Sequence, residues 1–325
     1  WDNPLWSVYL GYLKSIPEYR NAVRALAIWA CGKGWVTPDT KVNAMLENIR
    51  GSGEDTFDSI MQDMIIVKKT NGDAYLEIIR NDENPETILN LKKLNPAKVR
   101  VVYNPKGLIT NYDVMQADGK YQRFKTNEIF HISNDRIANE IHGISVIESC
   151  QWTIDAKNEA MADWRRILHR SIIRIMYIDA DDTAKLSTIK TQYSDAIKNG
   201  ELMIIPAKKG EAEFQDLVAP PLDAFLSWIK YLQDFFYQAV GVPKVIIGGT
   251  AENTEASAKV GVIVFDPVFI REITELEADI WNQLGLKIKI KVQPSLMDSV
   301  QSSEAANTGQ VGFQPNDTTI GSGKA

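Results

Sequence analysis

Residues 222–240 read LDAFLSWIKYLQDFFYQAV, with apolar side chains at alternating steps of three and four residues. This spacing predicts a helix with one continuous apolar face. The face consists of Leu222, Phe225, Ile229, Leu232 and Phe236. It is widened by Leu226, Trp228, Tyr231 and Phe235. A face this wide indicates that the helix is buried on more than one side.

A second long helix follows after a short break. Gly241-Val242-Pro243 ends the first helix, because proline has no backbone N–H and disfavours a helical residue before it. A glycine-containing loop comes next, and Asn253 or Thr254 is expected to cap a helix reaching Leu284. Within this second helix, Pro267 predicts either a kink or a new start of the helix with Asp266 as its cap. A stripe of Ile273, Leu276, Ile280 and Leu284 is expected to be buried, with Glu272, Glu275 and Asp279 facing elsewhere.

Composition indicates a soluble globular protein with a substantial core. The chain has 325 residues, of which 44% are hydrophobic and 24% charged, and it has no apolar run of about 20 residues and no signal peptide. Cys31 and Cys150 match no metal-site spacing, which favours a reduced, cytoplasmic history. A net charge of −6 argues against a broad nucleic-acid-gripping surface, although such a chain could still surround nucleic acid. The start at Trp1 is typical of a fragment or a processed form.

The remaining pattern predicts an α+β fold. Residues 1–35 are expected to be helical, and strands are expected at 64–67, 74–79, 99–103, 112–115 and 128–132, with Asn71-Gly72 as a hairpin turn. Ser145 and Glu148 form a capping box for a helix reaching Arg170. A β-α-β-β insert covers 172–217, and Lys287–Val292 alternates as a half-exposed strand. From Ser302 the sequence is typical of a disordered or partner-ordered tail.

Residues with catalytic or metal-binding potential form no convincing active site. The sequence contains no phosphate-binding loop. Asp179, Asp181 and Asp182 could bind a divalent ion, but aspartates before a helix are more often caps. The three histidines, His131, His142 and His169, are expected to be structural. The arginine and lysine groups are more typical of solvated faces than of a nucleic-acid site.

Four ordered motifs resemble the portal proteins of tailed bacteriophages and related viruses, the HK97-like portal family. The first is Pro17–Trp35, which is similar to an early helix of that family. The second runs from Asp73 to Val99 (DAYLEIIR, then LNPAKV), and the third combines EIFHI at 128–132 with HGISVIE at 142–148. The third departs from the family pattern, because Val146 stands where proline is usual. The fourth is Gly241-Val242-Pro243 with the residues that follow it.

The resemblance implies a portal fold with a β-rich wing, a two-helix stem, a small α/β clip and a long kinked tunnel helix. The implied boundaries are the wing with N-terminal helices at 1–144, stem helices at 145–170 and 219–241, the clip at 171–218, the tunnel loop at 242–254, the kinked tunnel helix at 255–285, a strand returning to the wing or a short crown at 286–301, and a flexible tail at 302–325.

The resemblance also implies a function without catalysis. Family members form a ring, usually dodecameric, at one capsid vertex, and double-stranded DNA passes through it during packaging and ejection. The implied partners are terminase, the major capsid protein and a head–tail adaptor, with no cofactor, no metal and no membrane. The implied location is the virion, after synthesis in the host cytoplasm. The alternative is a metal-dependent nucleic-acid-processing enzyme that uses Asp179, Asp181 and Asp182.

The boundaries implied by the resemblance assign two groups of site residues. The tunnel-loop residues expected to face DNA are Lys244, Gly248, Gly249, Thr250, Glu252 and Asn253. The loop could instead pack against a neighbouring subunit. Because the stem helices carry more apolar surface than a two-helix pair consumes, three residues are expected to be buried between subunits: Trp164, Trp228 and Phe235.

Overall fold

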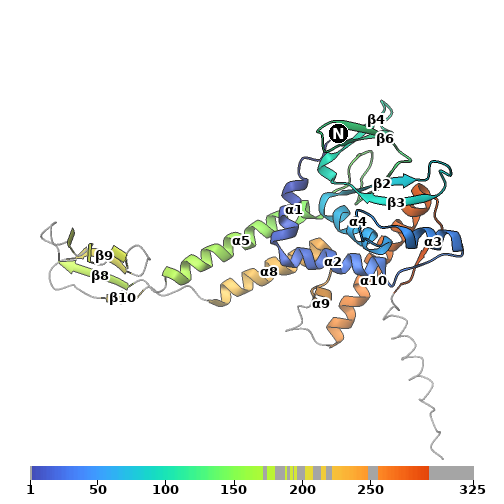
Figure 1. Cartoon of the computed structure of the whole chain (residues 1–325). Helices are drawn as coiled ribbons and strands as arrows, with labels where there is room; N and C mark the ends of the chain where they lie inside the picture. Colours follow the sequence, from blue (N-terminus) through green and yellow to red (C-terminus); the bar gives the residue numbers. More distant parts are fainter. Residues whose placement is uncertain are drawn as a thin grey trace, which may run out of the picture. The chain divides into compact units, whose positions relative to one another are not determined.

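The computed structural model describes residues 2–170, 174–179, 187–188, 191–192, 194–195, 202–207, 214–216, 222–247 and 255–292. These residues form two compact units (Figure 1). The first, which we call the body, lies within Trp1–Ile147 and Val240–Ala325. The second unit lies within Glu148–Ala239.

The N-terminal part of the body is helical. Helices α1 (Trp6–Ser15), α2 (Pro17–Cys31) and α4 (Phe57–Asn71) pack against one another, and α3 (Thr40–Asn48) lies against strand β3 (Ile88–Lys93). Their ends follow local chemistry: Pro17 occupies the first turn of α2, and Thr56 and Ser59 form a capping box for α4. Between α2 and α3 the chain forms the short strand β1 (Trp35–Val36).

Helix α4 corrects two expectations. Residues 64–67 are helical rather than extended, because the buried face of α4 continues through Met64, Ile65 and Lys68 at helical spacing. Asn71-Gly72 is not a hairpin turn. Gly72, at φ +93°, ends α4, and its N–H donates to the carbonyl of Lys68.

Two antiparallel sheets follow α4, as the pattern predicted. The first has the order β3 (Ile88–Lys93), β2 (Asp73–Arg80), β7 (Ile129–Ser133), and the second the order β4 (Val99–Tyr103), β5 (Ile109–Met115), β6 (Tyr121–Lys125). A single turn, η1 (Pro96–Lys98), precedes β4. Tyr75 of β2 and Ile129 of β7 join the apolar cluster of the second sheet, so one core connects the two sheets.

The C-terminal part of the body completes the larger core. Helix α9 (Lys244–Ile247) precedes α10 (Glu255–Asp279), which continues into the π-helical turn η2 (Ile280–Leu284). The expected apolar stripe of α10 and η2 is buried, together with Phe265 and Phe269. Helix α10 runs through Pro267 without a restart. Strand β11 (Lys289–Ile290) then pairs with β1. Exposed lysines alternate with the buried Ile288 and the half-buried Ile290 as expected, but Val292 is exposed.

The second unit contains two long helices and a small sheet. Helices α5 (Val146–Arg170) and α8 (Leu222–Val240) run side by side (Figure 1). The sheet has the order β10 (Phe214–Asp216), β8 (Arg174–Asp179), β9 (Leu202–Ala207), with β9 parallel to β8 and β10 antiparallel to it. Helical residues occur at 187–188, 191–192 and 194–195, so the β-α-β-β order of the insert is confirmed. The cap at 253–254 and the tail from Ser302 lie outside the described residues.

Candidate functional site

Helix α8 carries an apolar surface much wider than one partner helix covers. Leu232 and Phe236 are buried, and Phe225 and Ile229 are half-buried. Exposed apolar side chains flank these four residues on both sides. Trp228, Tyr231 and Phe235 lie on one side, and Leu222 and Leu226 lie on the other. A helix that packs against one neighbour usually needs an apolar stripe about 100° wide. With 100° of rotation per residue, the apolar surface of α8 from Tyr231 to Leu226 spans about 220° around the helix axis.

Aromatic contacts use part of this surface within the chain. The rings of Trp164 and Phe225 stack with centroids 4.4 Å apart and planes 9° apart. Trp152 meets Phe235 edge to face at 6.3 Å. Trp228 also stacks on Tyr231 at 5.7 Å. All three predicted interface residues therefore have aromatic partners in their own chain, yet Trp228 and Phe235 remain 44% and 42% exposed.

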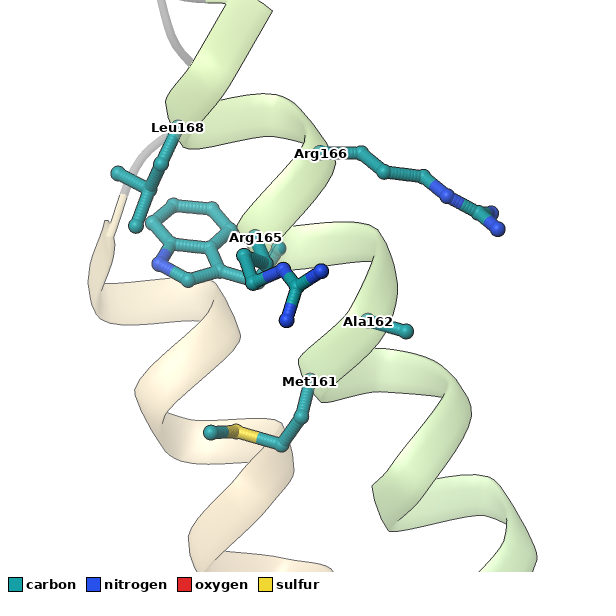
Figure 2. Close-up of a pocket in the computed structure, with 6 residues that line it drawn as sticks. Met161, Ala162, Arg165, Arg166 and Leu168 are labelled. Atoms are coloured by element: carbon teal, nitrogen blue, oxygen red, sulfur yellow. The ribbon is translucent and has the colours of Figure 1, made fainter.

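A hollow lies at the C-terminal half of α5. The described residues that line it are Met161, Ala162, Trp164, Arg165, Arg166 and Leu168. Met161 and Leu168 extend from α5 on the side of α8, whereas Arg166 extends on the other side (Figure 2). Arg166 pairs with Asp163 at 3.0 Å. The hollow thus combines exposed apolar side chains with guanidinium groups at its edge.

The segment expected to form a channel loop begins as a fixed structure. Val242 is fully buried in the body core, and Ile246 and Ile247 pack against this core. Helix α9 packs against α2 and α10, and the Ile246 N–H donates to the carbonyl of Pro243 at 3.0 Å. Lys244 is half-buried at the start of α9. Five of the six predicted channel residues, Gly248, Gly249, Thr250, Glu252 and Asn253, lie outside the described residues.

A buried carboxylate at the start of β2 collects three donors. Asp73 Oδ1 accepts from His131 Nε2 at 3.0 Å and from the Gly143 N–H at 3.1 Å, and Oδ2 accepts from His142 Nδ1 at 2.5 Å. Tyr112 Oη lies 3.0 Å from the other ring nitrogen of His131. In the tautomer in which Nε2–H donates to Asp73, Nδ1 accepts from the Tyr112 hydroxyl. His131 and His142 are thus hydrogen-bonded within the chain, as expected of structural histidines, whereas the side chain of His169 lies outside the described residues.

The pKa values of this group follow from burial and hydrogen bonding. Burial by itself raises the pKa of Asp73, but the hydrogen bonds from His131 and His142 outweigh it and bring the pKa to about 2. Burial, followed by the charge of Asp73, raises the pKa of Tyr112 to about 12. Asp73 therefore keeps its charge, and Tyr112 its proton, at neutral pH.

A second buried charge cluster joins α4 to α10. Lys68 Nζ lies 3.0 Å from Glu272 and 3.2 Å from Glu275, and Lys69 pairs with Glu272 as well. Glu272 is only 5% exposed, so the expectation that it faces away from the core is wrong. The two lysines of the last turn of α4 neutralise it, and cations are favoured at that end of a helix.

Most of the chain matches a known protein family. The profile of a family described as phage portal protein matches residues 26–265. The chain belongs to the phage portal protein family. Members of this family are structural rather than enzymatic, and no catalytic family is indicated. No curated protein matches the sequence significantly.

Solved structures show the same portal fold. The neck of a native gene transfer agent particle, computed with C12 symmetry, matches with a TM-score of 0.68 at 19% identity, over 97% of this chain and 92% of that one. An HK97 family phage portal protein from Corynebacterium diphtheriae matches with a TM-score of 0.59 at 14% identity, over 88% and 95% of the two chains. The mixed helix and sheet fold expected from the resemblance is thus confirmed.

Most of the aspartate cluster of the alternative metal-dependent enzyme lies outside the described residues. Asp179 ends β8, whereas Asp181 and Asp182 lie outside the described residues. Among the residues that the structure describes, no group of His, Cys, Asp and Glu is arranged to hold a metal ion. Cys31 and Cys150 are free and buried, and burial raises their pKa values to about 12 and about 11, so both are poor nucleophiles. No helix in the described part of the chain could cross a membrane.

Proposed function

We propose that this chain is a portal subunit, and that twelve copies form a ring at one capsid vertex for packaging and ejection of double-stranded DNA. The observation that carries this proposal is the portal family match over residues 26–265. The neck particle computed with C12 symmetry supports twelve subunits, and a second neck structure, of an empty particle with C6 symmetry, supports a ring.

The apolar surface of α8 supplies the physical motive for assembly. In a closed ring each subunit contacts its neighbour through two different patches. The side of α8 that carries Trp228 and Phe235 would meet the neighbouring subunit, with Trp164 contributing the part of its ring that Phe225 leaves uncovered. Exposed aromatic groups of this kind are rare on monomers and common at the centres of interfaces.

The channel function rests on weak contact with DNA. Residues 242–254 would form the channel loop, where Lys244 attracts phosphates and Glu252 limits how tightly they are held. Each phosphate contact adds salt-dependent affinity, so an acidic subunit with a net charge of −6 suits a conduit through which DNA must slide. Terminase would supply the motor, and the major capsid protein and a head–tail adaptor would bind other surfaces of the ring.

Ring formation is the direct test. The full chain is purified at neutral pH and examined by mass photometry and negative-stain microscopy. Twelve copies of a 36.5 kDa chain give a species of about 440 kDa with a central hole. A chain that stays a compact monomer over a range of salt and protein concentrations, with no annular particles, would contradict the proposal.

A further inference from the structure

The segment before α5 is held to the body by an unusual concentration of polar contacts. Besides the bonds to Asp73, the Ile144 N–H donates to the Asn134 carbonyl at 2.8 Å, and Asn134 Nδ2 donates to the Ile144 carbonyl at 2.7 Å. Ser145 Oγ donates to the Thr70 carbonyl at 2.6 Å and accepts from the Ile147 N–H at 3.1 Å. Ser145 thus caps α5 while it is bonded to the end of α4.

Two glycines allow the backbones to touch at this place. A Cβ on Gly72 would lie 2.1 Å from the Gly143 carbonyl oxygen, and a Cβ on Gly143 would lie 2.2 Å from the Gly72 carbonyl oxygen. Neither distance is sterically possible, so any other residue would push the two segments apart. Gly143 is therefore placed where its N–H can reach the Asp73 carboxylate.

We infer that Asp73 and His142 are positioning residues that fix the start of α5 to the body. We call Asp73, His142 and Gly143 the Asp73 anchor. The inference rests on the proposed function only because it takes α5 as a stem helix of the ring. The anchor ties the first residues of α5, which belong to the body, to α4 and β2.

The chemistry of the anchor makes it permanent rather than switchable. The Asp73 side chain is fully buried, and an unpaired buried carboxylate is strongly disfavoured, so moving His142 and Gly143 away would leave the charge without two of its three donors. With a pKa of about 2, Asp73 keeps its charge throughout the neutral range.

Hydrogen–deuterium exchange of the full chain tests the inference. The amides of 143–150 report the anchored segment, and those of 60–66 in α4 report the body. In His142→Ala the donor to Asp73 is lost, and we expect 143–150 to exchange about tenfold to a hundredfold faster while α4 is unchanged. In His142→Asn the amide nitrogen stands as many bonds from Cα as Nδ1 does, so we expect near wild-type protection.

The matched control is Asp113→Asn, which removes a surface ion pair with Arg123 on β5 and β6 and should leave 143–150 unchanged. If His142→Ala does not fold, Asp73→Asn replaces it with the same two readouts. Unchanged exchange in His142→Ala, or equally fast exchange in His142→Ala and His142→Asn, would overturn the inference. Because these measurements need no ring, mass photometry of the same samples separates failure of the anchor from failure of the portal proposal.

Discussion

The contribution of Asp73 to the stability of the fold depends on pH in the acid range. Its pKa of about 2 in the folded chain lies below the usual value of about 4, so the stabilisation is complete above about pH 4 and is lost as the pH falls towards about 2. The difference corresponds to about 2 kcal/mol.

The prediction is that Asp73→Asn removes this pH dependence. Urea unfolding of wild type and Asp73→Asn should differ by about 2 kcal/mol at pH 6, and the difference should shrink at about pH 2.5. Other carboxylates titrate in both chains, so only the difference between them reports Asp73. A difference that is constant from pH 6 to 2.5 would show that the carboxylate charge is not what stabilises this site.

The Lys68–Glu272 pair gives a second prediction, because both groups are buried. Burial lowers the pKa of Lys68, but Glu272 and Glu275 outweigh it and raise that pKa. Glu272→Leu would leave Lys68 with the half-exposed Glu275 only, and should cost about 3 kcal/mol in chemical unfolding. The double variant Lys68→Met, Glu272→Leu should cost less than Glu272→Leu alone, since the fully buried Lys68 charge is then removed and only Lys69, whose side chain is 12% exposed, lacks its carboxylate. A double variant that is less stable than the single one would contradict this explanation.

Neither charge cluster could be predicted from the sequence. Asp73, His131 and His142 are separated by 58 and 11 residues, and Lys68 lies 204 residues from Glu272. Local spacing indicates which residues share a helix face, but it does not indicate which distant elements will meet. Local spacing therefore places Glu272 away from the core, although two lysines of another helix neutralise it inside.

At the scale of elements, α8 gives the sharpest prediction. Trp228→Glu places a charge in the exposed aromatic part of its surface, where burial against a second subunit would be strongly disfavoured. We expect smaller species than wild type in mass photometry at equal protein concentration. Ser227→Glu is the control, because Ser227 belongs with Asp223, Lys230 and Asp234 to a separate exposed polar face of α8. Rings that persist in Trp228→Glu would remove this residue from the interface.

Elements with strong periodicity were predicted well, and short apolar runs were not. The helices at 146–170 and 222–240 and the strands β2, β4, β5 and β7 lie close to where the pattern put them. The run of Met64–Val67 is too short to distinguish strand from buried helix, and the helical neighbours of this run decided the outcome. Pro267 was also ambiguous. Its missing N–H removes one helical bond, and packing of Phe265 and Phe269 in the core keeps α10 continuous around it.

At the scale of the whole molecule, the isolated chain should be catalytically silent. The sequence has no phosphate-binding loop, and the described cysteines are poor nucleophiles. We expect no ATP hydrolysis and no magnesium-dependent cleavage of double-stranded DNA by purified rings. Cleavage that disappears in Asp181→Ala would support the metal-dependent enzyme instead.

The last prediction concerns the proposed channel loop, whose base is fixed and whose glycines permit many backbone angles. Val242, Ile246 and Ile247 hold its start in the body core, so deleting Gly248–Ala251 should leave the fold and the ring intact. The loop's contact with DNA should be lost, and particles assembled with the deleted chain should package or retain less DNA. A four-residue substitution of 248–251 by serines, which keeps the length, controls for strain at the junction with α10. If the deletion instead abolishes ring formation while any surviving rings package normally, residues 248–251 make an assembly contact and do not line the channel.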